Sequence, residues 1–223
     1  DALVKPLLYT NISGLEKLPV PEAKERFISA VLPAVLVAKN EIETLSIQMV
    51  VLKDKENWDE TDSTFFNEIK IRYKAKDIDD LIFRIGTMPN SIVLAQAAVE
   101  SGWGQSRFFL EGNNLFGMWS FKANEPRMAA GRTRQGKRIY LRAYPDLSQS
   151  IIHYFEILGS SNAYRSLRKE RQNTSDPLEL LPHLKNFSER RTSYTNQLKE
   201  VILQNNLMMY DEYRIDPEYL VAN

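Results

Sequence analysis

The sequence has no cysteine and only two histidines among its 223 residues. Without cysteine there is no disulfide framework, no thiolate metal site and no cysteine nucleophile. The two histidines, His153 and His183, are too few for a histidine-based metal centre, and they also disfavour a Ser-His-Asp triad. We therefore expect no metal and no other cofactor.

An excess of charge of either sign is also missing, because 29 basic residues balance 29 acidic ones. Bulk attraction to nucleic acid is therefore not implied, and nucleic acid is not expected as a partner. The longest apolar run, residues 30–38, is too short to cross a bilayer and contains Pro33. The length suits one domain with a helical extension. The oligomeric state is not determined, and a monomer is the default expectation.

Apolar residues recur at helical spacing along most of the chain. Pro33 is expected to kink or divide the first helix, and Gly102 with Gly104 is expected to end the helix that precedes them. Turn glycines and alternating polarity predict a small β-hairpin over residues 131–141. The expected helices span about 21–42, 63–73, 77–85, 91–101, 147–158, 178–184 and 193–207.

Glu100 lies in the last turn of the predicted helix at 91–101. The negative end of the helix dipole disfavours its ionised form, and nearby aromatic residues can form an apolar wall that acts in the same direction. A carboxyl group kept protonated near neutral pH can donate a proton to a glycosidic oxygen. These local features alone still favour an ordinary exposed glutamate at a helix end.

Two sequence motifs favour a catalytic role for Glu100 instead. Residues 94–104 (LAQAAVESGWG) and 113–117 (NNLFG) together resemble the active-site signature of bacterial cell-wall N-acetylglucosaminidases of the flagellar muramidase and autolysin type. The chain is most similar to the Bax-type glucosaminidase-domain group of Gram-negative bacteria. The resemblance continues through residues 144–154, 186–194 and 205–207, and residues 21–42 resemble the helical leader of that group.

The resemblance implies a mainly α, lysozyme-like helical lobe with a small β-hairpin lobe and an N-terminal helical extension. We expect the extension at 1–86, packed on the core, the glucosaminidase domain at 87–208 and a surface tail at 209–223. It also implies an endo-β-N-acetylglucosaminidase acting on peptidoglycan glycan strands, in the periplasm or cell envelope. No targeting signal is visible at the start of the sequence.

In the family the corresponding glutamate is the general acid, so the resemblance assigns this role to Glu100. Tyr194 falls where relatives place an active-site tyrosine, although a core aromatic is the alternative. Sugar rings stack on aromatic faces, and an amide can reach an acetamido group; Asn114 can equally brace the turn beside it. The expected substrate-binding residues are Trp103, Asn114, Phe116, Trp119 and Tyr144.

The hairpin departs from the family pattern, because many relatives carry a second carboxylate there. Between Glu125 and Asp146 there is no acidic residue, and this stretch holds six basic ones. The two-carboxylate scheme therefore does not transfer directly. Glu111, Glu125 or Glu189 could supply the second acid; the 2-acetamido group of the substrate could act as nucleophile; or a muramyl hydroxyl could attack, as in lytic transglycosylases.

Three functions thus remain open at this point. The leading one is a peptidoglycan hydrolase, and the second is a lytic transglycosylase on the same strand. The third is a catalytically impaired peptidoglycan-binding module, for which the missing hairpin carboxylate is the best argument. The two intact motifs and Tyr194 favour an enzyme.

Overall fold

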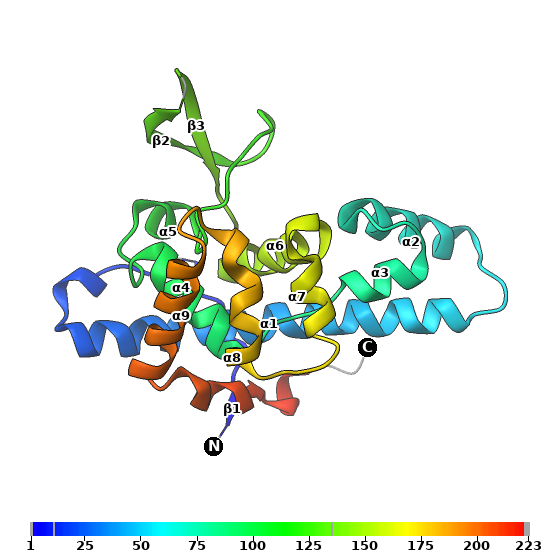
Figure 1. The fold of residues 1–223 in the computed structure, drawn as a ribbon, viewed down its shortest axis with the longest axis horizontal. Helices are drawn as coiled ribbons and strands as arrows, with labels where there is room; N and C mark the ends of the chain where they lie inside the picture. Colours follow the sequence, from blue (N-terminus) through cyan, green and yellow to red (C-terminus); the bar gives the residue numbers. More distant parts are fainter. Residues whose placement is uncertain (1, 11, 135, 221–223) are drawn as a thin grey trace.

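The computed structural model describes residues 2–10, 12–134 and 136–220, and helices dominate it (Figure 1). The strands described form two small sheets, one parallel and one antiparallel. In chain order the elements are β1 (Leu3–Val4), α1 (Val20–Asp54), α2 (Glu60–Tyr73), α3 (Ile78–Arg84), α4 (Asn90–Ser101), α5 (Arg107–Gly112), β2 (Arg127–Arg134), β3 (Lys137–Arg142), α6 (Leu147–Ser160), α7 (Arg165–Glu170), α8 (Pro177–Leu180), α9 (Thr192–Gln204) and β4 (Arg214–Ile215).

Helix α1 is a single element of 35 residues that runs along the whole body (Figure 1). Pro33 does not divide it, contrary to one of the two outcomes expected from the sequence. The carbonyl of Ser29 loses its usual helical partner at Pro33, but Ser29 is exposed, so water can reach that carbonyl. Meanwhile Val31, Leu32 and Val35 are buried in the core. Burial on both sides of the proline therefore keeps the helix continuous.

The second half of α1 forms an arm together with α2 and α3 (Figure 1). Helix α2 begins with a capping box, in which the Asp59 side chain accepts from the Asp62 amide and the Asp62 side chain accepts from the Asp59 amide. Met49 of α1, Ile69 of α2 and Leu81 of α3 are buried at their contact. Helices α1, α2 and α3 also contact α6, so the arm continues into the main body.

Helix α4 lies at the centre of the molecule. Every side chain from residue 90 to residue 98 is buried. It packs against α1 on one side, α9 on another, and the 3₁₀ helix η4 (Leu207–Glu212) near its start. The alanines of this helix allow neighbours to approach closely.

Strands β2 and β3 form an antiparallel hairpin that projects from the helical body (Figure 1). The pairing extends from Arg127 opposite Arg142 to Arg134 opposite Lys137, with an irregularity between Ala129 and Thr133. The hairpin is therefore longer than the predicted 131–141. Gln135, in the predicted turn, lies outside the described residues.

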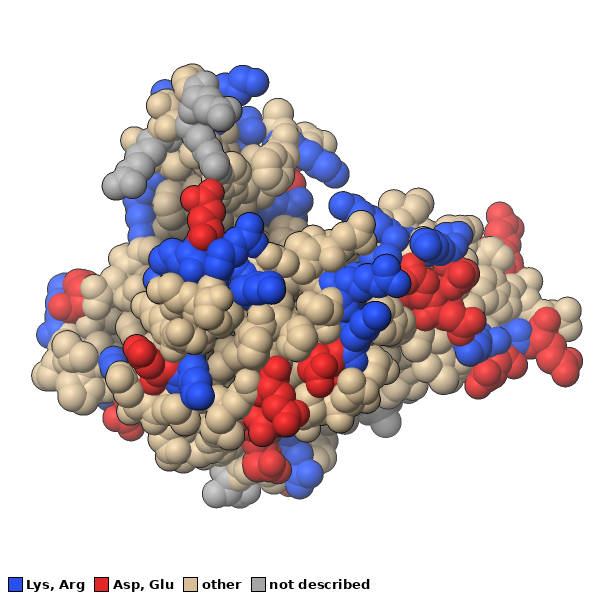
Figure 2. All heavy atoms as spheres, viewed as in Figure 1, with Lys and Arg blue, Asp and Glu red and all other residues tan. Residues whose placement is uncertain are grey.

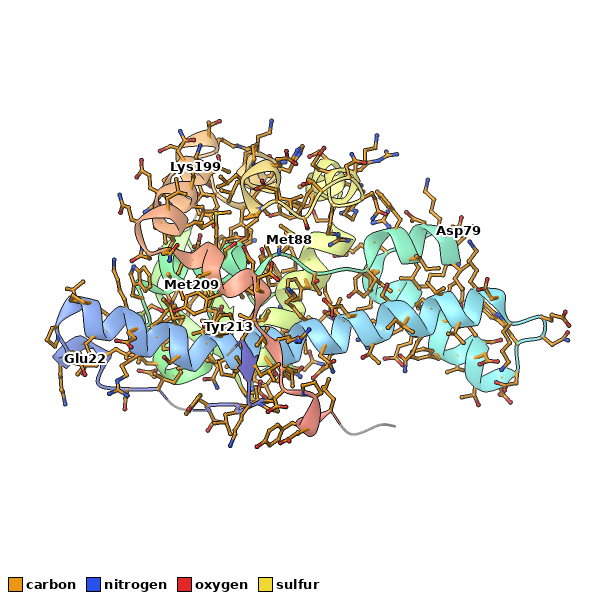
Figure 3. All side chains as sticks on the ribbon, turned by 90° about the horizontal axis from the view of Figure 1, so that it is seen from below. Glu22, Asp79, Met88, Lys199, Met209 and Tyr213 are labelled. Carbon is orange, nitrogen blue, oxygen red and sulfur yellow. The ribbon has the colours of Figure 1, made fainter. Side chains whose placement is uncertain are left out.

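The C-terminal segment is attached to the body at several points. β4 pairs in parallel with β1, so residues 214–215 lie side by side with residues 3–4. Figure 3 shows Met209 and Tyr213 on this segment where it passes α1 and α4. Residues 209–220, expected as a surface tail, thus include a strand and one buried residue, Ile215.

The short helices α5 and α7 were not predicted, because six residues are too few to display a helical period. Among the residues that the structure describes, no helix is both long and apolar enough to cross a membrane.

Candidate active site

The chain turns sharply after Glu100, at the end of α4. Gly102, Trp103 and Gly104 all have left-handed backbone conformations, with φ of 61°, 57° and 80°. The Ser101 hydroxyl holds this turn, because it donates to the Ala97 carbonyl at 2.6 Å and accepts from the Gly104 amide at 2.9 Å. Glycine adopts such φ values without strain, whereas Trp103 must be held in place by its packing. The turn ends the helix immediately after Glu100.

Glu100 is half-buried, and burial raises the pKa of its carboxyl group above the ordinary value. Two neighbours act in the opposite direction and lower the pKa: a hydrogen bond from the Tyr194 hydroxyl and the positive charge of Arg190. Burial is the largest of the three effects. The carboxyl group can therefore remain protonated closer to neutral pH than an exposed glutamate.

Tyr194, on α9, is fully buried and meets Glu100 through its hydroxyl. Its oxygen also accepts a hydrogen bond from Nε2 of Gln96 at 2.9 Å. The same Gln96 side chain accepts a hydrogen bond from the Tyr154 hydroxyl through Oε1. Three helices, α4, α6 and α9, thus meet in one buried chain of hydrogen bonds that ends at Glu100.

Aromatic rings enclose this chain. Phe116 stacks on Tyr154 with ring centroids 4.5 Å apart, and Phe187 stacks on Tyr194 at 5.9 Å. The guanidinium of Arg190 lies 5.4 Å from the centre of the Tyr194 ring. Burial and the nearby Glu100 raise the pKa of Tyr164 to about 12. The rings fix the two phenols and limit the access of water to Glu100.

Asn114, expected at the substrate, is buried and bound to the backbone. Its Nδ2 donates to the carbonyls of Met118 and Arg142 at 3.0 and 2.9 Å, and its Oδ1 accepts from the Met118 amide at 2.9 Å. The two bonds with Met118 close the turn after α5, and the bond to Arg142 fastens that turn to the end of β3. The structure therefore favours the bracing role for Asn114 over contact with sugar.

Tyr144 belongs to a second polar cluster at the base of the hairpin. Its hydroxyl lies 2.6 Å from Nδ1 of His153, and Nη1 of Arg142 lies 3.4 Å from Nε2 of the same ring. Burial, together with Arg142, lowers the pKa of His153 to about 4. A guanidinium only donates, so Nε2 accepts and the neutral ring carries its proton on Nδ1, which donates to Tyr144.

Glu125, one of the three acidic candidates considered from the sequence, belongs to this same cluster. It forms an ion pair with Arg142 and accepts from the amides of Phe121 and Lys122. Despite partial burial, its hydrogen bonds and the charge of Arg142 hold the pKa of Glu125 at about 2. Glu125 thus stays ionised and fastens the loop before β2 to β3.

The other predicted substrate residues lie in different surroundings. Phe116 is buried, as described above, and Trp103 is half-buried against α1, with its ring 5.6 Å from that of Phe27 and the Lys24 ammonium 4.7 Å away. Trp119, by contrast, is 40% exposed and forms an isolated bridge with Leu141, beside Phe121, which is 83% exposed. Trp119 is thus the exposed one of the five predicted substrate residues.

The ionisable neighbours that shift the pKa of Glu100 are a phenol and a guanidinium, not a carboxylate. Glu111 pairs with Arg107 at 3.8 Å and is exposed. Figure 2 shows mainly Lys and Arg on the hairpin and on the surface beneath it, where an acidic side chain also shows, whereas Asp and Glu are mixed with Lys and Arg on the arm. The described residues contain no cluster of three or more acidic or histidine side chains that could hold a metal ion.

Sequence reasoning missed the roles of Gln96 and Tyr154. Gln96 precedes Glu100 by four residues, so the two side chains lie on the same helix face. That spacing was a usable signal for Gln96. Tyr154 had no comparable signal, because its contact with Gln96 joins residues 58 positions apart.

A half-buried carboxyl group with a raised pKa, placed beside a phenol, is the kind of general acid that glycoside hydrolases use. Residues 75–207 match the family model named Glucosaminidase, described as mannosyl-glycoprotein endo-beta-N-acetylglucosaminidase. The chain belongs to this family and is a glycoside hydrolase.

Similar proteins are known from several bacteria. The chain is 26% identical over 208 residues to Protein bax of Escherichia coli strain K12, covering 85% of this chain and 72% of that protein. The catalytic domain of the autolysin Auto from Listeria monocytogenes is 21% identical, with a TM-score of 0.46 over 72% of this chain and 93% of that one. A peptidoglycan hydrolase from Sphingomonas sp. A1 is 25% identical, with a TM-score of 0.45 over 55% and 80% of the two chains.

Proposed function

We propose that this protein is an endo-β-N-acetylglucosaminidase that cleaves a β-1,4 bond of peptidoglycan glycan strands, with Glu100 as the general acid. The observation that carries the proposal is the carboxyl group of Glu100, which is half-buried, has a raised pKa and bonds to the Tyr194 hydroxyl. Family membership and the two sequence motifs support the glycan substrate. A location in the cell envelope follows from that substrate.

Protonated Glu100 donates its proton to the glycosidic oxygen as the bond from that oxygen to the anomeric carbon breaks. Burial favours the neutral acid before this step. After the transfer, the Tyr194 hydroxyl and the Arg190 charge stabilise the new carboxylate. The oxygen of a water molecule then bonds to the anomeric carbon, and the proton that this water loses restores Glu100 to its acid form. The balance between burial and these two partners thus suits a group that must both hold and release a proton.

A lytic transglycosylase is the second candidate. It needs one acid/base residue, because a hydroxyl of the substrate itself attacks the anomeric carbon. The groups that shift the pKa of Glu100 include no carboxylate, and Glu125 is held in an ion pair with Arg142. Both observations suit a single-acid mechanism, and the chemical form of the released sugar ends distinguishes it from hydrolysis.

The test is mass spectrometry of fragments released from purified peptidoglycan by the native protein and by Glu100→Gln. We expect the native protein to release fragments with N-acetylglucosamine at the reducing end. Loss of the acid should reduce that release by at least about a hundredfold. Glu200→Gln makes the same change at an exposed position of α9 and serves as the matched control; its release should equal that of the native protein.

Each other outcome points to a different function. Release of anhydromuramyl ends by the native protein but not by Glu100→Gln would indicate transglycosylation instead of hydrolysis, with Glu100 still acting as the acid. Equal release by the native protein and Glu100→Gln would remove Glu100 from the mechanism. Binding of both proteins to peptidoglycan without any release would indicate a binding module.

A further inference from the structure

Gln96 occupies the centre of the buried hydrogen-bond chain, between two phenols. It is fully buried, and both ends of its amide are used. Nε2 donates to the Tyr194 oxygen, and Oε1 accepts from the Tyr154 hydroxyl. A glutamine amide has a donor end and an acceptor end. These two contacts therefore fix which group donates and which accepts in each hydrogen bond of the series.

That direction determines where the hydrogen of Tyr194 points. A phenol has one hydrogen, and Nε2 of Gln96 supplies its own hydrogen to the Tyr194 oxygen. The hydrogen of Tyr194 is therefore available to Glu100, with which its hydroxyl is bonded. If the amide were reversed, Oε1 would face Tyr194 and take that hydrogen. Tyr194 would then present only lone pairs to the carboxylate, which is repulsive.

Tyr154 holds the amide in the productive orientation. Its hydroxyl donates to Oε1, and its ring is fully buried between Phe116 and Phe187. Reversal of Gln96 would place Nε2 against Tyr154 and turn the hydroxyl of Tyr154 away, in a buried space where its hydrogen would need another acceptor.

We propose that Gln96 is a positioning residue, which keeps the Tyr194 hydroxyl a hydrogen-bond donor to Glu100. It acts on the acid through Tyr194 and does not touch the reacting atoms. The inference rests on the proposed role of Glu100. The other charged and titratable groups that face this carboxyl are Arg190, just before α9, and Tyr164, after α6. Neither bonds to Gln96, so a change at Gln96 should leave their effects in place.

Gln96→Glu tests this directly in the full chain. The substitution keeps the shape but offers an acceptor at both ends, so the Tyr194 hydrogen is drawn away from Glu100. The Tyr194 bond lowers the pKa of Glu100, so losing it should raise that pKa. We expect carbon-13 NMR of labelled glutamate carboxyls, with Glu100 assigned by Glu100→Gln, to record the rise. The alkaline limb of the kcat profile should move up by the same amount.

The matched control is Gln105→Glu, which adds the same charge at an exposed position in the turn after α4. Neither the Glu100 titration nor the rate profile should change. An unaltered Glu100 pKa in folded Gln96→Glu would overturn the proposal. So would an equal shift in Gln105→Glu, because the charge alone would then explain it.

A double-mutant cycle covers the case in which Gln96→Glu does not fold. Gln96→Met and Tyr194→Phe are measured singly and together. If Gln96 acts through Tyr194, the pair should raise the Glu100 pKa and lower kcat no further than Tyr194→Phe alone, within about twofold. Additive effects would indicate that Gln96 contributes only to packing. The NMR measurement needs no turnover, so it still judges Gln96 if Glu100→Gln proves active and the proposed function fails.

Discussion

At the scale of single residues, the pKa of Glu100 reflects a balance between burial and two partners that stabilise its carboxylate. Burial raises its pKa, and the Tyr194 hydroxyl and Arg190 lower it. If burial acted alone, the carboxyl group would hold its proton too firmly. If the Tyr194 hydroxyl and Arg190 acted alone, the carboxyl group would lose its proton before the substrate arrives. The balance is set by side chains from α4 and α9, which meet only in the folded protein.

Tyr194→Phe removes one side of that balance. Without the phenol hydrogen bond the Glu100 pKa should rise, so the group stays protonated to a higher pH. Because a general acid must be protonated to act, the alkaline limb of the kcat profile should move upward. At its maximum kcat should fall about tenfold or more, because the new carboxylate loses a donor. A pH series of initial rates on purified peptidoglycan measures both effects. A downward movement of the limb would contradict this account of the acid.

At the scale of elements, the start of α4 is held by a residue 120 positions away. Asp211, on η4, accepts from the Ser91 amide at 2.7 Å and from the Ser91 hydroxyl at 2.8 Å. Helix α4 has Pro89 at its own N-cap position, with no side-chain cap. The carboxylate therefore satisfies an amide at the positive end of the helix dipole, and it does so from a different part of the chain.

Asp211→Ala should lower the free energy of unfolding by about 1 to 2 kcal/mol, as loss of an N-cap does elsewhere. Urea unfolding followed by circular dichroism measures the change. Asp211→Asn keeps one acceptor oxygen, so its free energy of unfolding should fall by less. An equal loss in Asp211→Ala and Asp211→Asn would assign the effect to charge and not to the hydrogen bond with the Ser91 amide.

The hairpin is likewise joined to the body by polar contacts at its base. Glu125 and Arg142 form an ion pair there, and Arg142 also reaches His153 on α6. Glu125, the acidic residue of this region, is therefore engaged in a structural ion pair. The sequence alone left it open whether Glu125 serves as a second acid, because the ion pair with Arg142 depends on a strand pairing that composition does not reveal.

At the scale of the whole molecule, the N-terminal segment packs directly onto the turn that follows Glu100. A Cβ at Gly104 would lie 2.8 Å from Leu15 and 2.9 Å from Phe27, and 3.0 Å from Phe109. Leu15 and Phe27 belong to the N-terminal extension, which we expected to pack on the core. Its contact with the turn shows that this part also shapes the surroundings of the acid.

Gly104→Ala should therefore destabilise the protein by about 3 kcal/mol, from both the left-handed backbone and the overpacking. Gly102→Ala separates the two causes, because Gly102 has a φ of 61° but no heavy atom within 4 Å of an added Cβ. It should lose only about 1 to 2 kcal/mol. Urea denaturation of both variants gives the comparison, and equal losses would exclude a role for the contact with Leu15 and Phe27.

The sequence by itself determined the helical class, the hairpin and the motif that contains Glu100, because these depend on local spacing and on residues close together in the chain. Helical periods marked the longer helices, and Gly102 marked the end of α4. Tertiary structure alone decided that α1 continues through Pro33, that Asn114 binds backbone, and that Gln96 links Tyr154 to Tyr194. Each of these depends on burial or on a hydrogen bond between residues distant in the chain, and no local pattern records which distant groups will meet.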